Sequence, residues 1–147
     1  MTWTTKFFGI AEAAAFDMRG NITASGLCPP LLQVESFPVQ INPWVILIVE
    51  SHDTEGEPPR SGSLQLEVTG PDGNALVAMQ QEVALQAKRV KGLPARAQIA
   101  AQLPMQAPKS GIYRVRVSFD FKSHGASSHE LELPIWDLAT FRSNQES

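Results

Sequence analysis

The sequence predicts an all-β fold, an antiparallel two-sheet β-sandwich of about eight or nine strands with an immunoglobulin-like or jelly-roll layout. Apolar and polar residues alternate along 63–69, 113–121 and 130–135, which is the period of strands with one buried and one solvated face. Turn signals rich in glycine and proline separate these segments. At 147 residues the chain has single-domain size, so we expect one domain over 1–147, an ordered core over about 7–137 and a polar tail over 138–147.

The first apolar segment, 8–18, is compatible with two structures. Its alanines favour a helix by propensity. Turn residues at 17–21 and a second apolar segment from Ile22 favour a strand, a turn and another strand. We prefer the two strands, with the helix as the alternative, because one side of the first strand is then apolar apart from Glu12: Phe8, Ile10, Ala14 and Phe16.

The next segments contain the most apolar stretch of the chain. Residues 31–37 are consistent with a strand that Pro38 ends. Pro43 then starts the segment 44–49, which is apolar on both faces and rich in β-branched residues, so we expect it to be the most deeply buried strand. Residues 51–62 combine acids, glycines and two adjacent prolines, which predicts a long surface loop.

A hairpin over 63–79 is the most specific structural signal. The sequence Gly70-Pro71-Asp72-Gly73 separates two apolar runs. The proline presets φ at the first turn position, and the second glycine adopts the left-handed conformation, which predicts a type I turn with a glycine bulge. This turn sets the expected register: Gly70 opposite Asn74, Val68 opposite Leu76, and Leu66 opposite Ala78.

The segment after this hairpin is less regular. Val83 and Leu85 continue the strand pattern, and a basic run follows: Lys88, Arg89, Lys91 and Arg96. Apolar residues alternate again along 96–103, so we expect a strand there, with a helical turn as the alternative. Residues 105–111 predict a turn-rich link.

Two strands near the end of the sequence are expected to pair. Segments 113–121 and 131–135 both place odd-numbered residues inward, so opposed residues have numbers with an even sum, and their loop holds three or five residues. Opposite charges then face each other on the outer surface: Arg114, Arg116 and Lys122 near Glu130 and Glu132.

Composition and charge exclude several classes of protein. A net charge of −3 argues against a nucleic-acid binder, and the basic run has no interleaved aromatic residues. The longest apolar run, 44–49, is far shorter than the roughly 20 residues of a membrane span, so we expect no membrane contact. A single cysteine, Cys28, excludes an intrachain disulfide and is consistent with a reducing compartment, so we expect a cytoplasmic protein.

The histidines and the cysteine do not form a recognisable site. His52 shares the 51–62 loop with three acids, Asp53, Glu55 and Glu57, but their spacing matches no zinc or calcium loop. His124 and His129 flank a turn, where we expect them to be exposed to water. Cys28 precedes two prolines, which favours a structural bend and a small buried side chain over a nucleophile.

The acids and tryptophans have structural explanations as well. Glu130 and Glu132 lie beside basic residues and are consistent with surface charge rather than a glycosidase pair. Exposed tryptophans would offer a sugar platform, but we expect burial of all three: Trp3, Trp44 and Trp136. We therefore expect no catalytic, cofactor-binding or metal residue and no cofactor.

Five local patterns occur in order along the chain: a strand opening of small residues over 10–15, a short strand ending in glycine over 20–26, a proline-led apolar strand over 37–49, the Pro71-Asp72-Gly73 hairpin, and a glycine-tyrosine strand start over 111–115. This order resembles an uncharacterised family of bacterial proteins classed as a domain of unknown function, over about residues 8–136. The resemblance implies a β-sandwich, and it implies neither an activity nor functional residues.

We expect a non-enzymatic binding or assembly module that acts through protein–protein contacts, since no reactive constellation is present and sandwiches expose edge strands. A homodimer through a sheet edge or through the outer face around Arg116 is the expected partnership. The alternative is a small-ligand or carbohydrate binder, or a weak hydrolase, that uses the loops 51–62 and 123–128.

Overall fold

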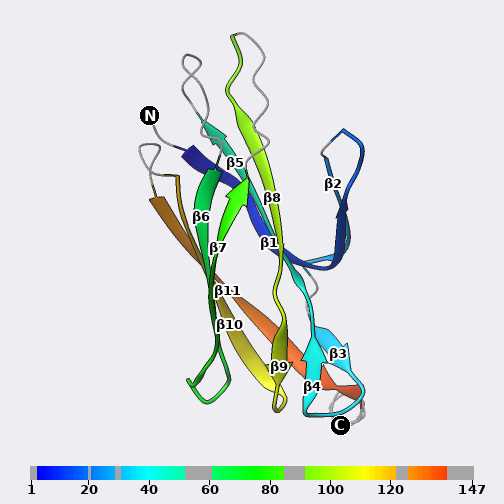
Figure 1. Cartoon of the computed structure of the whole chain (residues 1–147). Coiled ribbons are helices and arrows are strands. Elements are labelled where there is room, and N and C mark those ends of the chain that lie inside the picture. Colours follow the sequence, from blue (N-terminus) through cyan, green and yellow to red (C-terminus); the bar gives the residue numbers. More distant parts are fainter. Residues whose placement is uncertain are drawn as a thin grey trace.

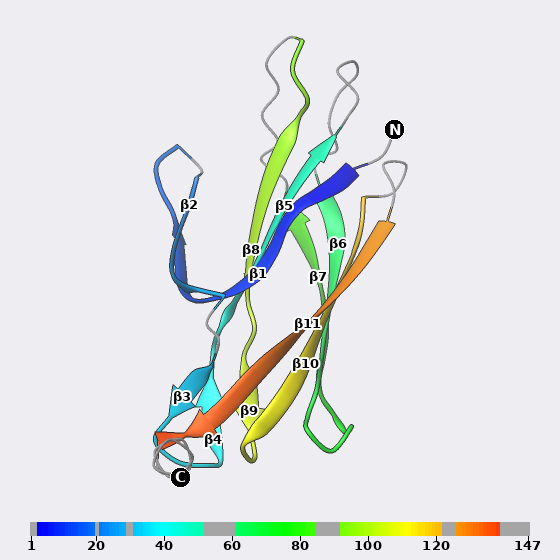
Figure 2. The ribbon, with the colours of Figure 1, turned by 180° about the vertical axis from the view of Figure 1, so that it is seen from behind.

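A computed structural model describes residues 3–19, 21–28, 31–51, 61–84, 92–121 and 126–138 of the chain. In this part of the chain the strands form two sheets packed face to face (Figures 1 and 2). The predicted all-β sandwich is therefore confirmed. The strands are β1 (Trp3–Phe16), β2 (Ile22–Leu27), β3 (Leu32–Val34), β4 (Val39–Ile41), β5 (Trp44–Ser51), β6 (Ser61–Thr69), β7 (Ala75–Ala84), β8 (Arg96–Gln102), β9 (Met105–Ala107), β10 (Gly111–Asp120) and β11 (Ala126–Asp137).

The two main sheets have a defined strand order. The four-stranded sheet runs β2-β1-β5-β8, and the five-stranded sheet runs β3-β11-β10-β6-β7. A small two-stranded sheet, β4-β9, lies at one end of the molecule beside β3 (Figure 1). Strand pairs are antiparallel except for β3, which pairs in parallel with the last residues of β11.

The β1–β2 hairpin confirms the strand, turn and strand expected at the start of the chain. β1 pairs with β5 from Trp3 to Ala11 and then leaves the sheet to pair with β2 alone. In both ribbon views this hairpin stands to one side of the sandwich (Figures 1 and 2). Phe16, which the alternation placed on an apolar side, is 52% exposed because it lies on this projecting part.

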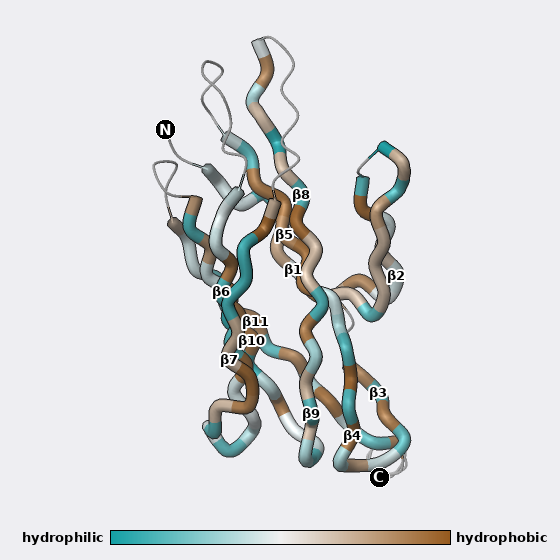
Figure 3. The backbone as a smooth tube through the Cα atoms, in the orientation of Figure 1, coloured by the Kyte–Doolittle hydropathy of each residue, from teal (hydrophilic) through white to brown (hydrophobic). Residues whose placement is uncertain are grey.

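The core lies between the two sheets. Its residues are the alternating inward side chains of the longest strands, such as Leu47 of β5, Leu66 of β6 and Val115 of β10, each at most 1% exposed. Figure 3 shows apolar residues concentrated along the middle of β1, β5 and β8. Period-two sequence is what places these residues on one face, since successive side chains of a strand point to opposite sides.

Strand β5 has the buried position that its composition predicted. It lies between β1 and β8, and its inward residues Val45, Leu47 and Val49 belong to the core. Ile46 and Ile48 point to the outer face, where Ile22 and Leu27 of the β1–β2 hairpin line the same apolar gap of about 170 Å³. The hairpin thus explains why this strand is apolar on both faces.

The hairpin over 63–79 forms the predicted turn, but with a different register. Gly70 donates its N–H to the Asn74 carbonyl at 2.8 Å, and Gly73 donates to the Gly70 carbonyl at 3.0 Å. The register then shifts between Val68 and Thr69. Val68 consequently lies opposite Val77 and Leu66 opposite Met79, so the expected pairs with Leu76 and Ala78 are wrong by one residue.

Replacing Gly73 by valine tests this turn. Gly73 has φ of +85°, and a Cβ built there meets nothing within 4 Å, so the substitution is opposed by backbone strain and not by a clash. We expect a loss of about 1–2 kcal/mol in the free energy of unfolding. Urea denaturation measures it, and Gly73→Asn, a residue that tolerates positive φ, is the control that should lose less. An unchanged midpoint for Gly73→Val would contradict the turn assignment.

Strands β10 and β11 pair as the sequence predicted. Val115 lies opposite Leu131, which gives the expected even sum, and the last pair is Asp120 with Ala126, so five residues separate the strands. Arg116 and Glu130 face each other with Nη2 and Oε2 3.0 Å apart. Arg114 lies opposite Glu132, while Lys122 lies outside the described residues.

Three short strands depart from the expectations. The strand expected over 31–37 is only Leu32–Val34, and β4 forms after Pro38 instead. β9 forms within 105–107, where the sequence predicted a link. Three-residue strands are too short to show a period, and they form through pairing with distant segments: β4 with β9, and β3 with the end of β11. The chain accordingly has more strands than the eight or nine expected.

A tyrosine corner anchors the start of β10. The hydroxyl of Tyr113 donates to the Lys109 carbonyl oxygen at 2.5 Å. The Lys109 N–H in turn donates to the Tyr113 hydroxyl oxygen at 3.4 Å. The ring is fully buried. This bond from a strand tyrosine to the backbone a few residues upstream is typical of Greek-key sandwiches.

Candidate functional site

Two rows of mostly polar side chains cross the outer face of the five-stranded sheet, the first of hydroxyls and amides and the second with the carboxylates of Asp120 and Glu82. In the first row Gln80 of β7 lies opposite Gln65 of β6, Gln65 opposite Ser118 of β10, and Ser118 opposite Ser128 of β11. In the second row Asp120 lies between Ser63 and Ala126. Four neighbouring strands therefore bring together polar residues that are spread over 63–128 in the sequence.

These rows line a hollow of about 490 Å³, which we call the polar hollow. Its outward-facing residues are Ser63, Gln65, Gln80, Ser118, Asp120, Ala126 and Ser128. Hydrogen bonds hold some of them in place: Gln80 Nε2 donates to Ser63 Oγ at 3.0 Å, and the hydroxyls of Ser118 and Ser128 are 3.2 Å apart. The small serine and alanine side chains leave the space open between the longer glutamines.

The character of the outer face changes at the next row. There Glu67, Arg116 and Glu130 lie side by side on β6, β10 and β11, and Arg116 is ion-paired with Glu130. The arginine of this row is therefore already ion-paired within the chain, whereas the polar hollow has no lysine, arginine or histidine among its described lining residues.

The second candidate surface is the outer side of β7, which we call the β7 edge. β7 pairs with β6 on one side, and among the described residues no strand pairs with its other side. Ten residues long, it contains neither proline, lysine nor arginine, and Glu82 is its one charged residue. Such an edge lacks the usual devices that prevent pairing with another chain.

The corresponding edge of the other sheet, β8, has a neighbour. The N–H of Ile22, at the start of β2, donates to Oε1 of Gln98 on β8 at 2.9 Å. The tip of the β1–β2 hairpin, the end of β7 and the middle of β8 together line a cleft of about 420 Å³, whose rim includes the fully exposed Met18. The hairpin thus lies beside the middle of β8 and reaches only the end of β7, at Val83 and Ala84.

His129 does not have the exposed position expected for a turn histidine. It is half-buried on β11, and its Nε2 lies 2.7 Å from Thr5 Oγ1 and 2.9 Å from Ser127 Oγ. The rings of Phe8 and Phe119 flank it with centroids at 5.6 and 6.0 Å. Because Thr5 and Phe8 belong to β1, His129 connects the two sheets, and its surroundings account for it as a structural group.

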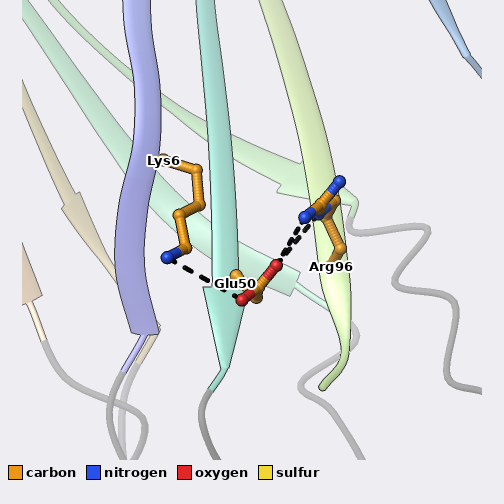
Figure 4. Close-up of polar contacts among 3 residues, drawn as sticks. All are labelled: Lys6, Glu50 and Arg96. Atoms are coloured by element: carbon orange, nitrogen blue, oxygen red, sulfur yellow. Dashed lines mark hydrogen bonds and ion pairs between the residues drawn. The ribbon is translucent and has the colours of Figure 1, made fainter. Parts of the chain in front are cut away.

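The described part of the basic run has a structural partner too. Arg96 on β8 approaches Glu50 on β5 with Nη2 and Oε2 2.6 Å apart, and Lys6 on β1 lies 3.9 Å from the other carboxylate oxygen (Figure 4). This ion triad spans three neighbouring strands of the four-stranded sheet. Lys88, Arg89 and Lys91 lie outside the described residues.

The other candidate residues that the structure describes do not gather into a site. Cys28 is exposed, so the expectation of a buried side chain was wrong. Trp3 is 7% exposed, and Trp44 and Trp136 are half-buried, so the three do not form an exposed platform. Glu130 and Glu132 lie on the outer face beside arginines, as expected. His52, Asp53, Glu55, Glu57 and His124 lie outside the described residues.

The described residues offer neither a metal site nor a membrane-spanning helix. They contain no group of three or more histidine, cysteine, aspartate or glutamate side chains placed to hold a metal ion. They also contain no helix that is long and apolar enough to cross a membrane.

Comparisons with known proteins give one matching family model and leave the activity open. The sequence model of a family described as "Family of unknown function (DUF6941)" matches residues 6–132. No curated protein matches the chain. Among solved structures, the chain is similar to the C-terminal domain of wzt, with a TM-score of 0.48 and 11% identity over 90% of this chain and 72% of the other.

Proposed function

This chain belongs to DUF6941, a family of unknown function, and from its own geometry we propose that it is a non-enzymatic assembly module in which two copies pair through their β7 edges. The observation that carries the proposal is the unprotected β7 edge: ten residues, one charge, and a pairing partner on one side among the described residues. Backbone donors and acceptors on such an edge are a template for a further strand.

Two copies of β7 complement each other in an antiparallel arrangement. With a two-fold axis at Gln80, Ala78 of one copy lies opposite Glu82 of the other, so the charged residue does not meet its own copy. Val77 lies opposite Val83 in the same register, and both side chains are half-buried toward the core. Pairing of this kind joins the two five-stranded sheets into one continuous sheet.

Two competing surfaces are less suited to self-association. The outer face around Arg116 was the other expected interface, but Arg116 already has Glu130 as a partner at 3.0 Å. The β8 edge lies beside the β1–β2 hairpin through the bond from Ile22 to Gln98. Among the described strands, β7 is paired along one side only, so its other side is the edge open to a further strand.

Two further features are consistent with an intracellular recognition module. The tyrosine corner at Tyr113 supports an immunoglobulin-like layout, a class of sandwich common in protein recognition. The exposed thiol of Cys28 supports a reducing compartment, which keeps such a thiol from oxidation.

A pair of proline variants tests the proposed edge. Successive residues of an antiparallel strand direct their N–H groups alternately toward one neighbouring strand and the other. Ala78 and Met79 are successive residues, so a proline at one of them removes an N–H that bonds to β6, and a proline at the other removes an N–H of the open edge. We expect one variant to lose stability and the other to lose association while it keeps its stability.

Sedimentation over a dilution series measures the association. The unchanged chain should dissociate toward its 16.0 kDa monomer only on dilution. Arg116→Glu is the matched control on the sheet face, and it should leave the association unchanged. A monomer mass at every concentration would contradict the proposal, and a dimer that only Arg116→Glu weakens would move the interface to the sheet face.

A further inference from the structure

We propose that the polar hollow is a binding site for a neutral saccharide. The proposal rests on side chains of the outer sheet face, whereas the β7 pairing rests on backbone groups of one edge, and Gln80 is the residue that the two surfaces share. The volume of about 490 Å³ lies within the range of about 300–1,000 Å³ typical of small-molecule sites.

The charges of the hollow select against ionic ligands. Asp120 is the one charged side chain among its lining residues. Because the described lining residues include no lysine, arginine or histidine, phosphates, carboxylates and nucleic acids find no ion-pair partner among them and are disfavoured. A simple cation is disfavoured as well, because the described residues hold no cluster of carboxylates and histidines at this place.

The polarity of the hollow selects against apolar ligands. Its outward-facing groups are hydroxyls, amides and one carboxylate, and the aromatic residue among the lining residues, Phe119, is only 3% exposed because its ring belongs to the core. An apolar molecule would cover these polar groups without replacing their hydrogen bonds to water, which is unfavourable. Most small-molecule pockets are apolar, so this composition indicates a strongly polar ligand.

The remaining class is a neutral molecule with many hydroxyls. Serine hydroxyls and glutamine amides both donate and accept hydrogen bonds, and sugar hydroxyls do the same. Gln65, Gln80, Ser63, Ser118 and Ser128 are all held on strands, and the bonds from Gln80 to Ser63 and from Ser118 to Ser128 orient four of them in advance. This array suits successive hydroxyls of a saccharide laid across the strands.

The absence of an exposed aromatic ring among these lining residues sets the expected affinity. Binding then depends on hydrogen bonds exchanged with water, each of which contributes little net free energy. We expect dissociation constants in the millimolar range. A longer saccharide should have a lower dissociation constant, because it contacts more of the polar rows.

Amide chemical shifts of the full chain, followed by NMR during titration, test the proposal. The probes are neutral trisaccharides of glucose, mannose, galactose and N-acetylglucosamine, with trigalacturonic acid as the anionic comparison. We expect at least one neutral probe to shift residues of the polar hollow in a saturable way, and we expect trigalacturonic acid to bind at least tenfold more weakly.

Variants on β6 and β10 make the test specific. The double change Gln65→Leu and Ser118→Ala removes one amide and one hydroxyl from the hollow, and we expect at least a tenfold loss of affinity, equal to about 1.4 kcal/mol. Glu67→Gln, at the next outward position of β6 and outside the hollow, is the matched control and should bind normally. Neither variant changes β7, so sedimentation should show unchanged self-association and separate this proposal from the previous one.

Three outcomes would overturn the proposal. The first is that no neutral probe at tens of millimolar produces localised shifts. The second is that the shifts lie outside the polar hollow. The third is that the double variant binds as tightly as Glu67→Gln. Equal binding of trigalacturonic acid would contradict the charge argument and would remove neutrality from the assignment.

Discussion

Replacing Leu47 by alanine is expected to lower the free energy of unfolding by about 2–5 kcal/mol, the range for large-to-small changes at buried sites. Leu47 is 1% exposed on β5, between β1 and β8, and its side chain lies in the core between the sheets. Rigid strands on both sides limit collapse around the deleted atoms, so the loss includes a cavity term as well as lost burial. Urea denaturation measures the change.

Ile48→Ala is the matched control for this prediction. Its side chain is half-buried on the outer face of the same strand, where it lines the apolar gap beneath the β1–β2 hairpin. That gap already provides open space, so we expect a smaller loss than for Leu47→Ala. A larger loss at Ile48, or a loss below about 0.5 kcal/mol at Leu47, would contradict the assignment of the two faces of β5.

Tyr113→Phe is expected to destabilise the fold by about 1–3 kcal/mol at neutral pH, because it leaves the Lys109 carbonyl without the hydroxyl that bonds to it at 2.5 Å. The ring itself is retained, so packing in the core changes little. Thermal or urea unfolding of the two proteins at pH 7 gives the difference.

The same tyrosine predicts how stability depends on alkaline pH. Burial raises the pKa of Tyr113 above its ordinary value of 10.0, although the hydrogen bond from the Lys109 backbone N–H lowers this pKa to a smaller extent. The folded chain therefore binds this proton more tightly than the unfolded chain. The resulting stabilisation is present below pH 10 and is lost as the pH rises through the pKa of the folded state.

This tyrosine is the only one in the chain, so tyrosinate absorbance reports its ionisation directly. We expect the absorbance of the folded chain to titrate above pH 10.0 and that of the unfolded chain at the ordinary value. Tyr113→Phe should show a flatter decline of stability with rising pH than the unchanged chain. Identical slopes for the two proteins would mean that the phenol is not more strongly protonated in the fold.

The longer strands could be predicted because local sequence determined them. Alternation along 113–121 sets which residues of β10 face inward, and the same parity in β11 fixes the even-sum register seen at Val115 and Leu131. Gly73 likewise specifies its turn through its own conformation. These features need no information from distant parts of the chain.

Features that depend on distant pairing could not be predicted. The strands β4 and β9 are three residues each and form because they meet each other, and the bulge near Val68 shifts the register of β6 and β7 by one residue. His129 was expected to be exposed because it follows a turn, yet Thr5 and Phe8 come from the other end of the chain to cover it.

The same reason explains why the sequence did not reveal the polar hollow. Its serines and glutamines are common surface residues, and no spacing in the chain connects Gln65, Gln80, Ser118 and Ser128. They form one row only because four strands lie in the order β11-β10-β6-β7. Of the loop expected over 123–128, residues 126–128 belong instead to β11 and line the hollow, and residues 123–125 lie outside the described residues.

Residue-resolved hydrogen exchange along β7, measured at low and at high protein concentration, tests the proposed assembly most directly. In the dilute chain the amides that bond to β6 should be protected, and the alternate amides of the open edge should exchange quickly. At high concentration the account predicts that these alternate amides become protected while those of β8 do not change. Exchange along β7 that is independent of concentration would contradict pairing through this edge.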